Sequence, residues 1–400
     1  MKIPTYITRT VVILSFVSLF NDAASEMLYP VMPIFLKSIG FSVLLIGILE
    51  GLAEATAGLS KGYFGKLSDS TGKRVPFVRI GYLLSAIAKP LMAVFLFPLW
   101  IFFARTIDRL GKGIRTGARD ALLSAEATPE IKGRVFGFHR GMDTLGAVFG
   151  PAMALVFLWL WPQQYRALFL VAFIPGILAL FFTLLLKEKA VKKEPSAKRA
   201  SFFDFVKYWK TSPRLYRKLS AGLLVFTLVN SSDVFLLLKI KESGVDDRMV
   251  IGIYIFYNLV YALASYPMGM LADKLGLKRV LIAGLVIFAS VYIGFALITS
   301  ITGFVTMFFL YGIYAAATEG VSKAWITNIS DKADTATAIG TYTAFQSLCT
   351  LIASSIAGLI WLKFGAMATF ALSAVVTLAV AGYLVSVKSE KETSNVRTKS

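Results

Sequence analysis

Residues 65–74 read Gly-Lys-Leu-Ser-Asp-Ser-Thr-Gly-Lys-Arg, and residues 269–279 read Gly-Met-Leu-Ala-Asp-Lys-Leu-Gly-Leu-Lys-Arg. Both stretches follow one pattern, Gly-x-Leu-small-Asp-x-x-Gly followed by a basic residue, and they begin 204 residues apart. A weaker match pairs Phe102-Phe103 with Phe308-Phe309, at an offset of 206 residues. Two matches at nearly one offset indicate that the chain contains two related halves.

The composition predicts a membrane protein. Of the 400 residues, 56% are hydrophobic and 16% are charged, and the mean hydropathy is +0.70. One water-soluble core cannot bury so much apolar side chain, and stretches of about 20 apolar residues, the length of a bilayer span, recur throughout. We predict an all-α membrane protein with twelve transmembrane helices in two pseudo-symmetric six-helix bundles. The predicted spans are residues 11–36, 43–64, 76–96, 98–124, 135–161, 166–186, 219–240, 249–271, 280–299, 302–329, 335–361 and 366–386.

The net charge of +19 lies mainly in loops on one predicted side of the membrane. Residues 187–218 hold eleven Lys and Arg against three Asp and Glu, whereas the turns at 97, 162–165 and 299–302 hold no Lys or Arg. This bias predicts that both termini and the middle linker are cytoplasmic, and it explains the charge without a nucleic-acid partner. The predicted units are an N-terminal bundle (1–186), a basic linker with an interfacial helix (187–218), a C-terminal bundle (219–386) and a cytoplasmic tail (387–400).

The residue types in the repeated stretch suggest its physical role. A glycine at a helix end allows a neighbouring helix to approach closely, and a second glycine permits a tight turn. The aspartate can meet a helix N-terminus or a cation, and the basic residues can anchor at the lipid headgroups. Two equivalent copies favour such a role over that of a generic loop.

With these two loops the chain resembles the major facilitator superfamily over nearly its full length. The resemblance implies two bundles related by an axis along the membrane normal, around a cavity that opens alternately to each side. It also implies that helices one, four, seven and ten line the cavity, and that the loops latch the outward-open state. Ser70 stands where the family usually has a basic residue, which implies a weaker first latch. The implied latch residues are Gly65, Asp69, Gly72, Arg74, Gly269, Asp273, Gly276 and Arg279.

The span 135–161 contains a second pattern, Gly-x-x-x-Gly-Pro, formed by Gly146, Gly150 and Pro151. In the superfamily this looks like the antiporter motif of efflux proteins, although Ala152 and Met153 replace the Gly-Gly that usually follows. Packing of small residues with a proline kink explains the pattern equally well. Both interpretations stay open.

The span 98–124 carries a stripe of charge. At 100° per residue its six ionisable side chains fall within an arc of about 120°, and a stripe of that length cannot face lipid. It either lines a cavity or forms a structural ion-pair network, to which Arg115 and Arg119 would belong, with Asp143 as one partner. Arg105 or Arg109 matches the arginine that the family carries in helix four. The stripe consists of Arg105, Asp108, Arg109, Lys112, Arg115 and Arg119.

Other intramembrane polar residues extend the candidate site. Prolines in the first span predict a kinked cavity helix. In the second half few polar residues stand out, and two of them, Glu319 and Lys323, are four residues apart and can neutralise each other. The positions 206 residues beyond the first three cations of the stripe are Tyr311, Ala315 and Thr318, so the second half is expected to supply an apolar and aromatic wall. The candidate cavity residues are Asn21, Asp22, Glu26, Arg105, Asp108, Arg109, Lys112, Asn230, Asp233, Glu319 and Lys323.

Proton coupling requires a partly buried carboxylate or histidine beside a cation. Asp22 and Glu26 are the first choice, and Asp143 qualifies by position. His139 is a further candidate, with packing as its alternative role.

The basic stripe favours an anionic or zwitterionic substrate. We predict a secondary transporter that moves a small organic solute across the cytoplasmic membrane by proton-coupled efflux. Uptake of an organic anion and divalent metal transport are alternatives, although one His and one Cys leave few metal ligands. No zinc-protease or nucleophile-elbow motif supports an enzyme, and no soluble appendage supports a receptor. The predicted partners are substrate, protons and lipid, without cofactor, metal site or nucleic acid, and the predicted state is a monomer.

Overall fold

The computed structural model describes residues 7–29, 31–32, 35–36, 39–40, 43–95, 97–188, 204–230 and 233–387, in which all regular secondary structure is helical. The helices are α1 (Arg9–Leu28), α3 (Val43–Thr71), α4 (Val75–Val94), α5 (Pro98–Ala125), α6 (Lys132–Leu160), α7 (Tyr165–Leu184), α8 (Asp204–Thr211), α9 (Arg214–Thr227), α10 (Val234–Glu242), α11 (Asp247–Leu275), α12 (Leu277–Leu297), α13 (Ile301–Asn328), the short 3₁₀ turn η1 (Lys332–Asp334) and α14 (Thr335–Ser386).

The described helices overlap the predicted spans, but α1 ends at Leu28 rather than at 36 and α3 continues to Thr71 rather than ending at 64. Three further differences lie in the second half. The span predicted at 219–240 is broken into α9 and α10, and α9 begins earlier than predicted, directly after Pro213. In the described part of the predicted linker, α8 is thus a separate helix of eight residues that precedes α9. The last two predicted spans lie in α14, which turns at Gly365, where φ is 82°. The rest of the predicted linker, 189–203, and the predicted tail beyond 387 lie outside the described residues.

Eight of the described helices are long and apolar enough to cross a membrane. Large apolar side chains lie on the outside of the molecule, as Leu99, Trp159 and Leu362 illustrate, and soluble proteins rarely expose apolar surface so extensively. The charged helix α5 is not one of the eight, because its polar face lowers its hydropathy. These helices make the chain a multi-pass membrane protein.

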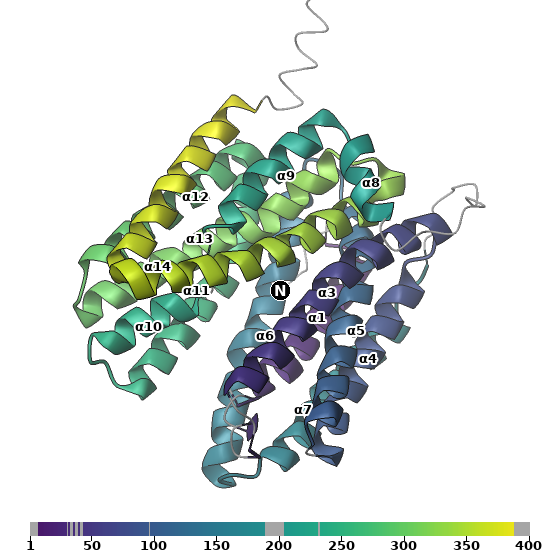
Figure 1. Ribbon diagram of the computed structural model, residues 1–400. Coiled ribbons are helices and arrows are strands. Elements are labelled where there is room, and N and C mark those ends of the chain that lie inside the picture. The colour runs from purple at the N-terminus through teal and green to yellow at the C-terminus, as the bar shows by residue number, and fades with distance from the viewer. Residues whose placement is uncertain are drawn as a thin grey trace, which may run out of the picture.

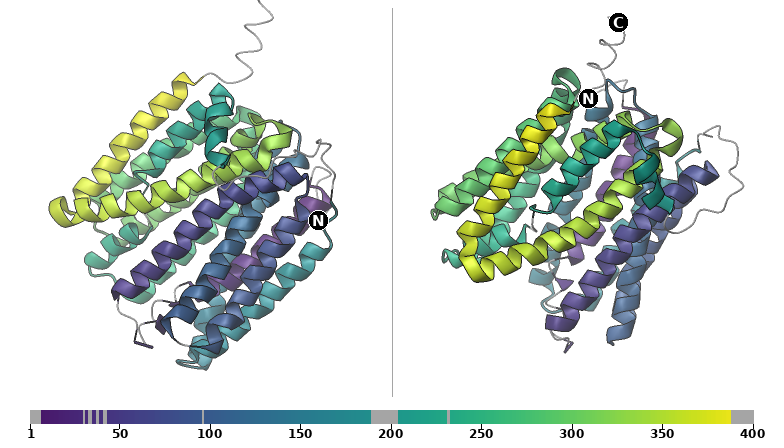
Figure 2. Two further views of the ribbon diagram at one scale, coloured as in Figure 1. Left: turned by 45° about the vertical axis from the view of Figure 1, so that its right-hand side comes forward. Right: turned by 45° about the horizontal axis from the view of Figure 1, so that its top comes forward.

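The helices pack in two groups (Figures 1 and 2). In one group α1 packs on α6 and α7, and α4 and α3 pack on α5; in the other α11 and α14 are joined through α12 and α13. The apolar cores follow the same division: one consists of residues from 208–387, and two smaller ones consist almost wholly of residues from 7–186. Each group therefore has its own core.

The two groups touch along the helix pairs α6–α11 and α3–α14. Glycines make the approach possible, because a Cβ on Gly137 would collide with the carbonyl oxygen of Ser265, and one on Gly340 with that of Lys61. These contacts lie toward the end that carries loops 65–74 and 269–279, here named the loop end. Figure 1 shows the groups meeting beside α8 and diverging toward α7 and α10.

Candidate functional site

A cavity of about 330 Å³ lies between the two groups. Charged residues of α1, α5 and α6 line one side, and tyrosines and other polar residues, mainly of α11, α13 and α14, line the other. The lining consists of Asp22, Ser25, Glu26, Lys61, Asp108, Arg109, Lys112, Arg115, Thr116, Arg119, Arg140, Asp143, Thr144, Ala147, Asp233, Tyr254, Tyr257, Asn258, Tyr261, Glu319, Lys323, Thr343 and Gln346.

Eight of the eleven predicted cavity residues line this cavity, and so does Asp143. The other three lie nearby. Asn21 is buried and donates to Asp22 Oδ1 at 3.4 Å, while Asn230 donates to the Tyr314 hydroxyl at 3.2 Å. Arg105 lines a small adjoining pocket of about 20 Å³.

The partner of Asp108 is Lys89 of α4, which the sequence analysis did not consider. Lys89 Nζ donates to Asp108 Oδ1 at 2.7 Å and to Ser25 Oγ at 3.2 Å. The lysine is only 1% exposed, so this ion pair is a buried link between α4 and α5. A signal for it existed, since a lone cation in an apolar span requires a polar partner.

The stripe on α5 divides into two parts. Arg115 is buried against α4, where it donates to Ser85 Oγ at 2.6 Å and lies 4.5 Å from the centre of the Tyr82 ring. Arg115 also reaches the cavity lining, but Lys112, which lines the cavity together with Arg109, is exposed there. The stripe is therefore partly structural and partly a cavity surface.

Arg119, Asp120 and Lys323 connect the two groups of helices. Arg119 Nε donates to Asp120 Oδ1 at 2.9 Å, and Lys323 Nζ lies 2.8 Å from Asp120 Oδ2. The suggestion that Lys323 and Glu319 neutralise each other is wrong for this structure, because Lys323 reaches across to α5. Lys323 pairs with the buried carboxylate of the facing helix rather than with the glutamate four residues before it on its own helix.

His139 lies behind the cavity rather than on its surface. Its Nε2 is 3.0 Å from Ser18 Oγ, and Ser18 also accepts from Arg119 at 3.3 Å. Both His139 and Ser18 are buried, so His139 links α1, α5 and α6 through one hydroxyl.

Arg140 joins a carboxylate of its own helix to the opposite wall. Its Nη1 donates to Asp143 Oδ2 at 2.8 Å, and its Nε donates to the Tyr261 hydroxyl. The guanidinium carbon lies 5.2 Å from the centre of the Tyr261 ring, within cation–π range. Asp143 is thereby paired, whereas its neighbour Asp22 on α1 lacks such a cation partner within 4 Å in the described chain.

Three tyrosines of α11 form the aromatic part of the lining. Tyr254, Tyr257 and Tyr261 are spaced at i, i+3 and i+7, which places them on one helix face. The ring centres of Tyr254 and Tyr257 are 6.0 Å apart, and those of Tyr257 and Tyr261 are 6.1 Å apart. An apolar and aromatic wall was expected from the second half, but this periodic tyrosine stripe was not among the predictions, although its spacing is visible in the sequence.

At the loop end, Asp69 meets the start of α14. Its Oδ2 accepts from the backbone N of Thr337 at 2.6 Å and from the Thr337 hydroxyl at 2.8 Å. Arg74 Nη2 lies 3.6 Å from the other carboxylate oxygen, and Arg74 also donates to the carbonyl oxygen of Lys332. The first loop is thus bound to the N-terminus of a helix in the other group, where a negative charge is favourable.

Asp273 makes the equivalent contact at the start of α6. It accepts from the backbone N of Gly133 at 2.7 Å and of Arg134 at 3.0 Å, and from Arg134 Nε at 2.7 Å. Gly276 has a φ of 97°, as Gly72 has a φ of 66°, which explains a glycine at both turns. The two loops therefore bind opposite groups in the same manner.

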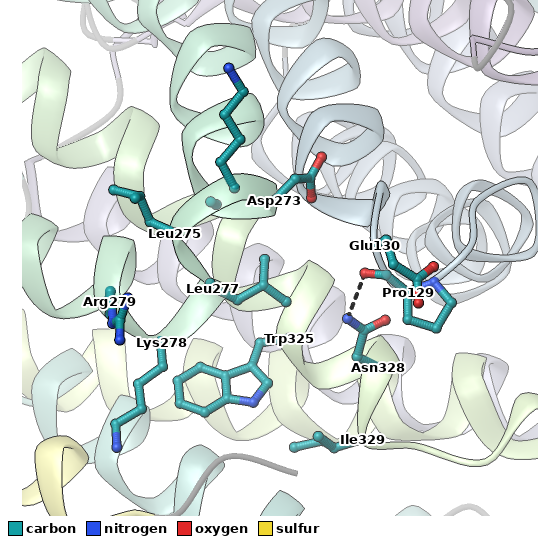
Figure 3. A pocket seen from close by; sticks show the side chains of 13 residues that line it. Pro129, Glu130, Asp273, Leu275, Leu277, Lys278, Arg279, Trp325, Asn328 and Ile329 are labelled. Atoms are coloured by element: carbon teal, nitrogen blue, oxygen red, sulfur yellow. Dashed lines mark hydrogen bonds between the residues drawn. The ribbon is translucent and has the colours of Figure 1, made fainter. Parts of the chain in front are cut away.

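Arg279 departs from this equivalence. It lines a loop-end pocket of about 550 Å³ with Lys274 and Trp325 (Figure 3). The cation at Asp273 is instead Arg134. Figure 3 also shows Asn328 donating to the carbonyl oxygen of Pro129 at 3.1 Å, a further link between the groups. The predicted latch residue Arg279 is thus not the cation that pairs with Asp273, whereas its counterpart Arg74 pairs with Asp69.

The glycines of the second pattern pack α6 on α1. A Cβ on Gly150 would lie 2.6 Å from the carbonyl oxygen of Ala23, and one on Gly146 would collide with that of Leu19. Pro151 follows inside the continuous helix α6. The packing interpretation therefore has a direct structural basis.

Comparisons with known proteins agree with this architecture. A model of the Major Facilitator Superfamily matches residues 14–256 and 241–400. An uncharacterized MFS-type transporter of Methanocaldococcus jannaschii is 35% identical over 385 residues, which cover 95% of this chain and 94% of the relative. A multi-drug resistance efflux pump of Streptococcus pneumoniae is 24% identical over 282 residues, covering 67% of this chain and 68% of the pump.

Two solved structures share the fold. The human organic anion transporter MFSD10 is 16% identical, with a TM-score of 0.78 over 96% of this chain and 100% of that one. FucP, the fucose:proton symporter of E. coli, in its outward conformation is 12% identical, with a TM-score of 0.75 and the same coverage. At these identities the likeness concerns the fold alone.

Proposed function

Because the chain belongs to the major facilitator superfamily, whose members are membrane transporters rather than enzymes, we propose that it exports a small organic anion or zwitterion in exchange for protons. The observation that carries the proposal is the central cavity, in which Arg109 and Lys112 of α5 share one wall with Asp22 and Glu26 of α1. Cations bind the negative group of a substrate, while a carboxylate that gains and loses a proton can couple its release to the gradient.

The proposed architecture is that of twelve spans in two six-helix bundles (1–186 and 219–386), joined by a cytoplasmic linker. The positive charge near the loop end supports a cytoplasmic location for that end and for both termini. With that end in the cytoplasm, the contact between the helix groups there would make this an outward-open state of a protein of the cytoplasmic membrane. The latch residues of loops 65–74 and 269–279 would then hold that state, and the monomer would be the functional unit.

Asp22 and Glu26 are the proposed proton carriers. Both line the cavity, and both interact electrostatically with Lys112 on the facing helix. Substrate binding at Lys112 would change the charge that these carboxylates experience. Asp143 and His139 are weaker candidates, because Asp143 is paired with Arg140 and His139 lies behind the surface.

Efflux is supported by similarity to the pneumococcal multi-drug efflux pump and by the Gly146–Pro151 pattern, although the glycines also have a packing role. Uptake of an organic anion is the main alternative, since FucP shares the fold and is a proton symporter. Divalent metal transport has less support: no group of three or more His, Cys, Asp or Glu among the described residues is arranged to hold a metal.

Three compounds with one phenyl ring but different charge test the proposal: 3-phenylpropionate, phenylalanine and 2-phenylethylamine. We expect the anion and the zwitterion to raise the melting temperature of the purified protein more than the amine or Mn²⁺ does. Inside-out vesicles should accumulate the bound compound when the lumen is acidic, and Asp22→Asn or Glu26→Gln should abolish that dependence. Accumulation that ignores the gradient would refute proton coupling, and accumulation only by right-side-out vesicles would indicate uptake.

A further inference from the structure

We infer that the substrate is an aromatic organic acid or amino acid, whose ring lies against the tyrosines of α11 while its negative group meets Lys112 of α5. This inference rests on the proposed transport function and specifies the substrate class of the same cavity. It is carried by three observations: a tyrosine face on one wall, one hydroxyl on that face that no hydrogen bond holds within the described chain, and a cation on the facing wall that forms no ion pair within 4 Å there.

Tyr254, Tyr257 and Tyr261 present a continuous aromatic surface to the cavity. Their ring centres are separated by 6.0 Å and 6.1 Å, within the 4.5–7 Å range of favourable aromatic pairs. Behind them Tyr311 packs 5.0 Å from Tyr257, so the surface is held by the core of the second helix group. A planar ring in the cavity would add a further member to this cluster.

The hydroxyl of Tyr257 differs from those around it. Tyr261 accepts from Arg140, Tyr311 donates to Asp233 Oδ1 at 2.7 Å, and Tyr314 accepts from Asn230. Tyr257 is only 6% exposed as a residue and lines the cavity, and within the described chain no hydrogen bond holds its hydroxyl. A hydroxyl that no protein group holds can donate to or accept from a ligand in the cavity.

Lys112 supplies the corresponding charge on the facing wall. Its side chain is exposed in the cavity, and its ammonium forms no hydrogen bond or ion pair within 4 Å among the residues that the structure describes. Lys89, by contrast, is buried and bound to Asp108. Lys112 is thus available to the carboxylate of a substrate. If the ring of that substrate contacts the tyrosines, the substrate lies between α5 and α11.

The volume limits the substrate further. A cavity of about 330 Å³ is at the lower end of the range for small-molecule sites, roughly 300–1,000 Å³. It accommodates one ring or a fused pair with a charged side group rather than an extended molecule. The structure therefore assigns a compact aromatic acid to this site.

Cyclohexyl analogues of the three phenyl compounds test whether the site prefers an aromatic ring. They are 3-cyclohexylpropionate, cyclohexylalanine and 2-cyclohexylethylamine, each with the charge of its phenyl counterpart and a more hydrophobic ring. If apolar burial alone drove binding, the cyclohexyl compound would bind at least as tightly. We expect the phenyl acid to bind about 3- to 10-fold more tightly, as aromatic pairing adds to burial.

Variants locate the ring. Tyr257→Leu should remove most of the preference for phenyl over cyclohexyl, while Tyr257→Phe should retain it. Phe256→Leu, on the same helix but away from the cavity lining, is the matched control and should leave both affinities unchanged. Lys112→Ala should weaken the binding of the phenyl acid and of the cyclohexyl acid to the same extent.

The two proposals fail in different ways. Equal or tighter binding of the cyclohexyl acids would overturn the aromatic assignment while leaving anion transport intact. If 2-phenylethylamine bound more tightly than the acids and also more tightly than 2-cyclohexylethylamine, the anionic part of both proposals would be overturned. The contact between ring and tyrosines would be retained. Ring selectivity that persists in Tyr257→Leu would show that the ring binds elsewhere and refute the proposed site.

Discussion

Asp120 of α5 and Lys323 of α13 form an ion pair, with 2.8 Å between Oδ2 and Nζ, that crosses from one group of helices to the other. The Asp120 side chain is 1% exposed and that of Lys323 is 19% exposed, so the pair is largely shielded from water. Its atoms must separate whenever the loop end opens. In the proposed transport cycle the pair therefore stabilises the state with a closed loop end relative to the state with an open one.

Asp120→Asn should destabilise the closed loop end, because it leaves the cations of Arg119 and Lys323 together without their carboxylate. Removing one member of a buried pair costs about 3–5 kcal/mol. The distance between spin labels at Glu130→Cys and Lys274→Cys, in a Cys349→Ser background, should shift toward longer values. Asp120→Asn with Lys323→Gln should recover part of the loss, and strictly additive effects would show that the pair is not coupled.

Asp69→Asn and Asp273→Asn should both favour an open loop end. Each loses a charged acceptor at a helix N-terminus, worth about 1–2 kcal/mol, so the ratio of open to closed molecules should rise about 5- to 30-fold. The same pair of spin labels measures this ratio. Asp334→Asn is the control and should change it little, because its partly exposed carboxylate lies 3.9 Å from Lys66. An unchanged ratio in both variants would remove the latch role.

Lys89→Met should lower stability strongly, because Asp108 would remain charged and buried beside α4. A loss of about 3 kcal/mol or more is expected in the free energy of unfolding. Lys89→Met combined with Asp108→Leu should be more stable than Lys89→Met alone, as two apolar groups need no partner. Thermal unfolding in detergent checks the order, and a double variant less stable than either single one would contradict the structural role of the pair.

Gly146→Ala and Gly150→Ala should separate α6 from α1 and lower the melting temperature, with a cost of about 1–3 kcal/mol each. Gly252→Ala and Gly382→Ala are matched controls, since an added Cβ there meets no atom within 4 Å. These controls should be neutral or slightly stabilising, because alanine favours helices. If Gly146→Ala leaves stability intact but abolishes the proton dependence of transport, the antiporter interpretation of the pattern is the better one.

The chain's periodicity and composition predicted where its helices lie, because the length of an apolar run and the polarity at its ends are local properties. Even the equivalence of loops 65–74 and 269–279 was visible, and the aspartates were expected at helix N-termini. The break between α9 and α10 was not predicted, although the four consecutive turn-favouring residues 230–233, Asn-Ser-Ser-Asp, are a local signal for it.

The candidate site was predictable only in part. A charged residue inside a predicted span must face water or a partner, and that rule identified eight residues that line the cavity. Applied consistently, it would also have identified Lys89, and the spacing of Tyr254, Tyr257 and Tyr261 would have indicated the aromatic face.

By itself the sequence determined that the chain is embedded in a membrane, that its two parts share a loop motif, and that many of its intramembrane charges lie on α5. Tertiary structure alone decided which of these charges meet. Lys323 pairs with Asp120 rather than Glu319, and Asp108 with Lys89, because ion pairing depends on the rotation and separation of helices that are far apart in sequence. Those quantities follow from the packing of all the helices together, and no local pattern records them.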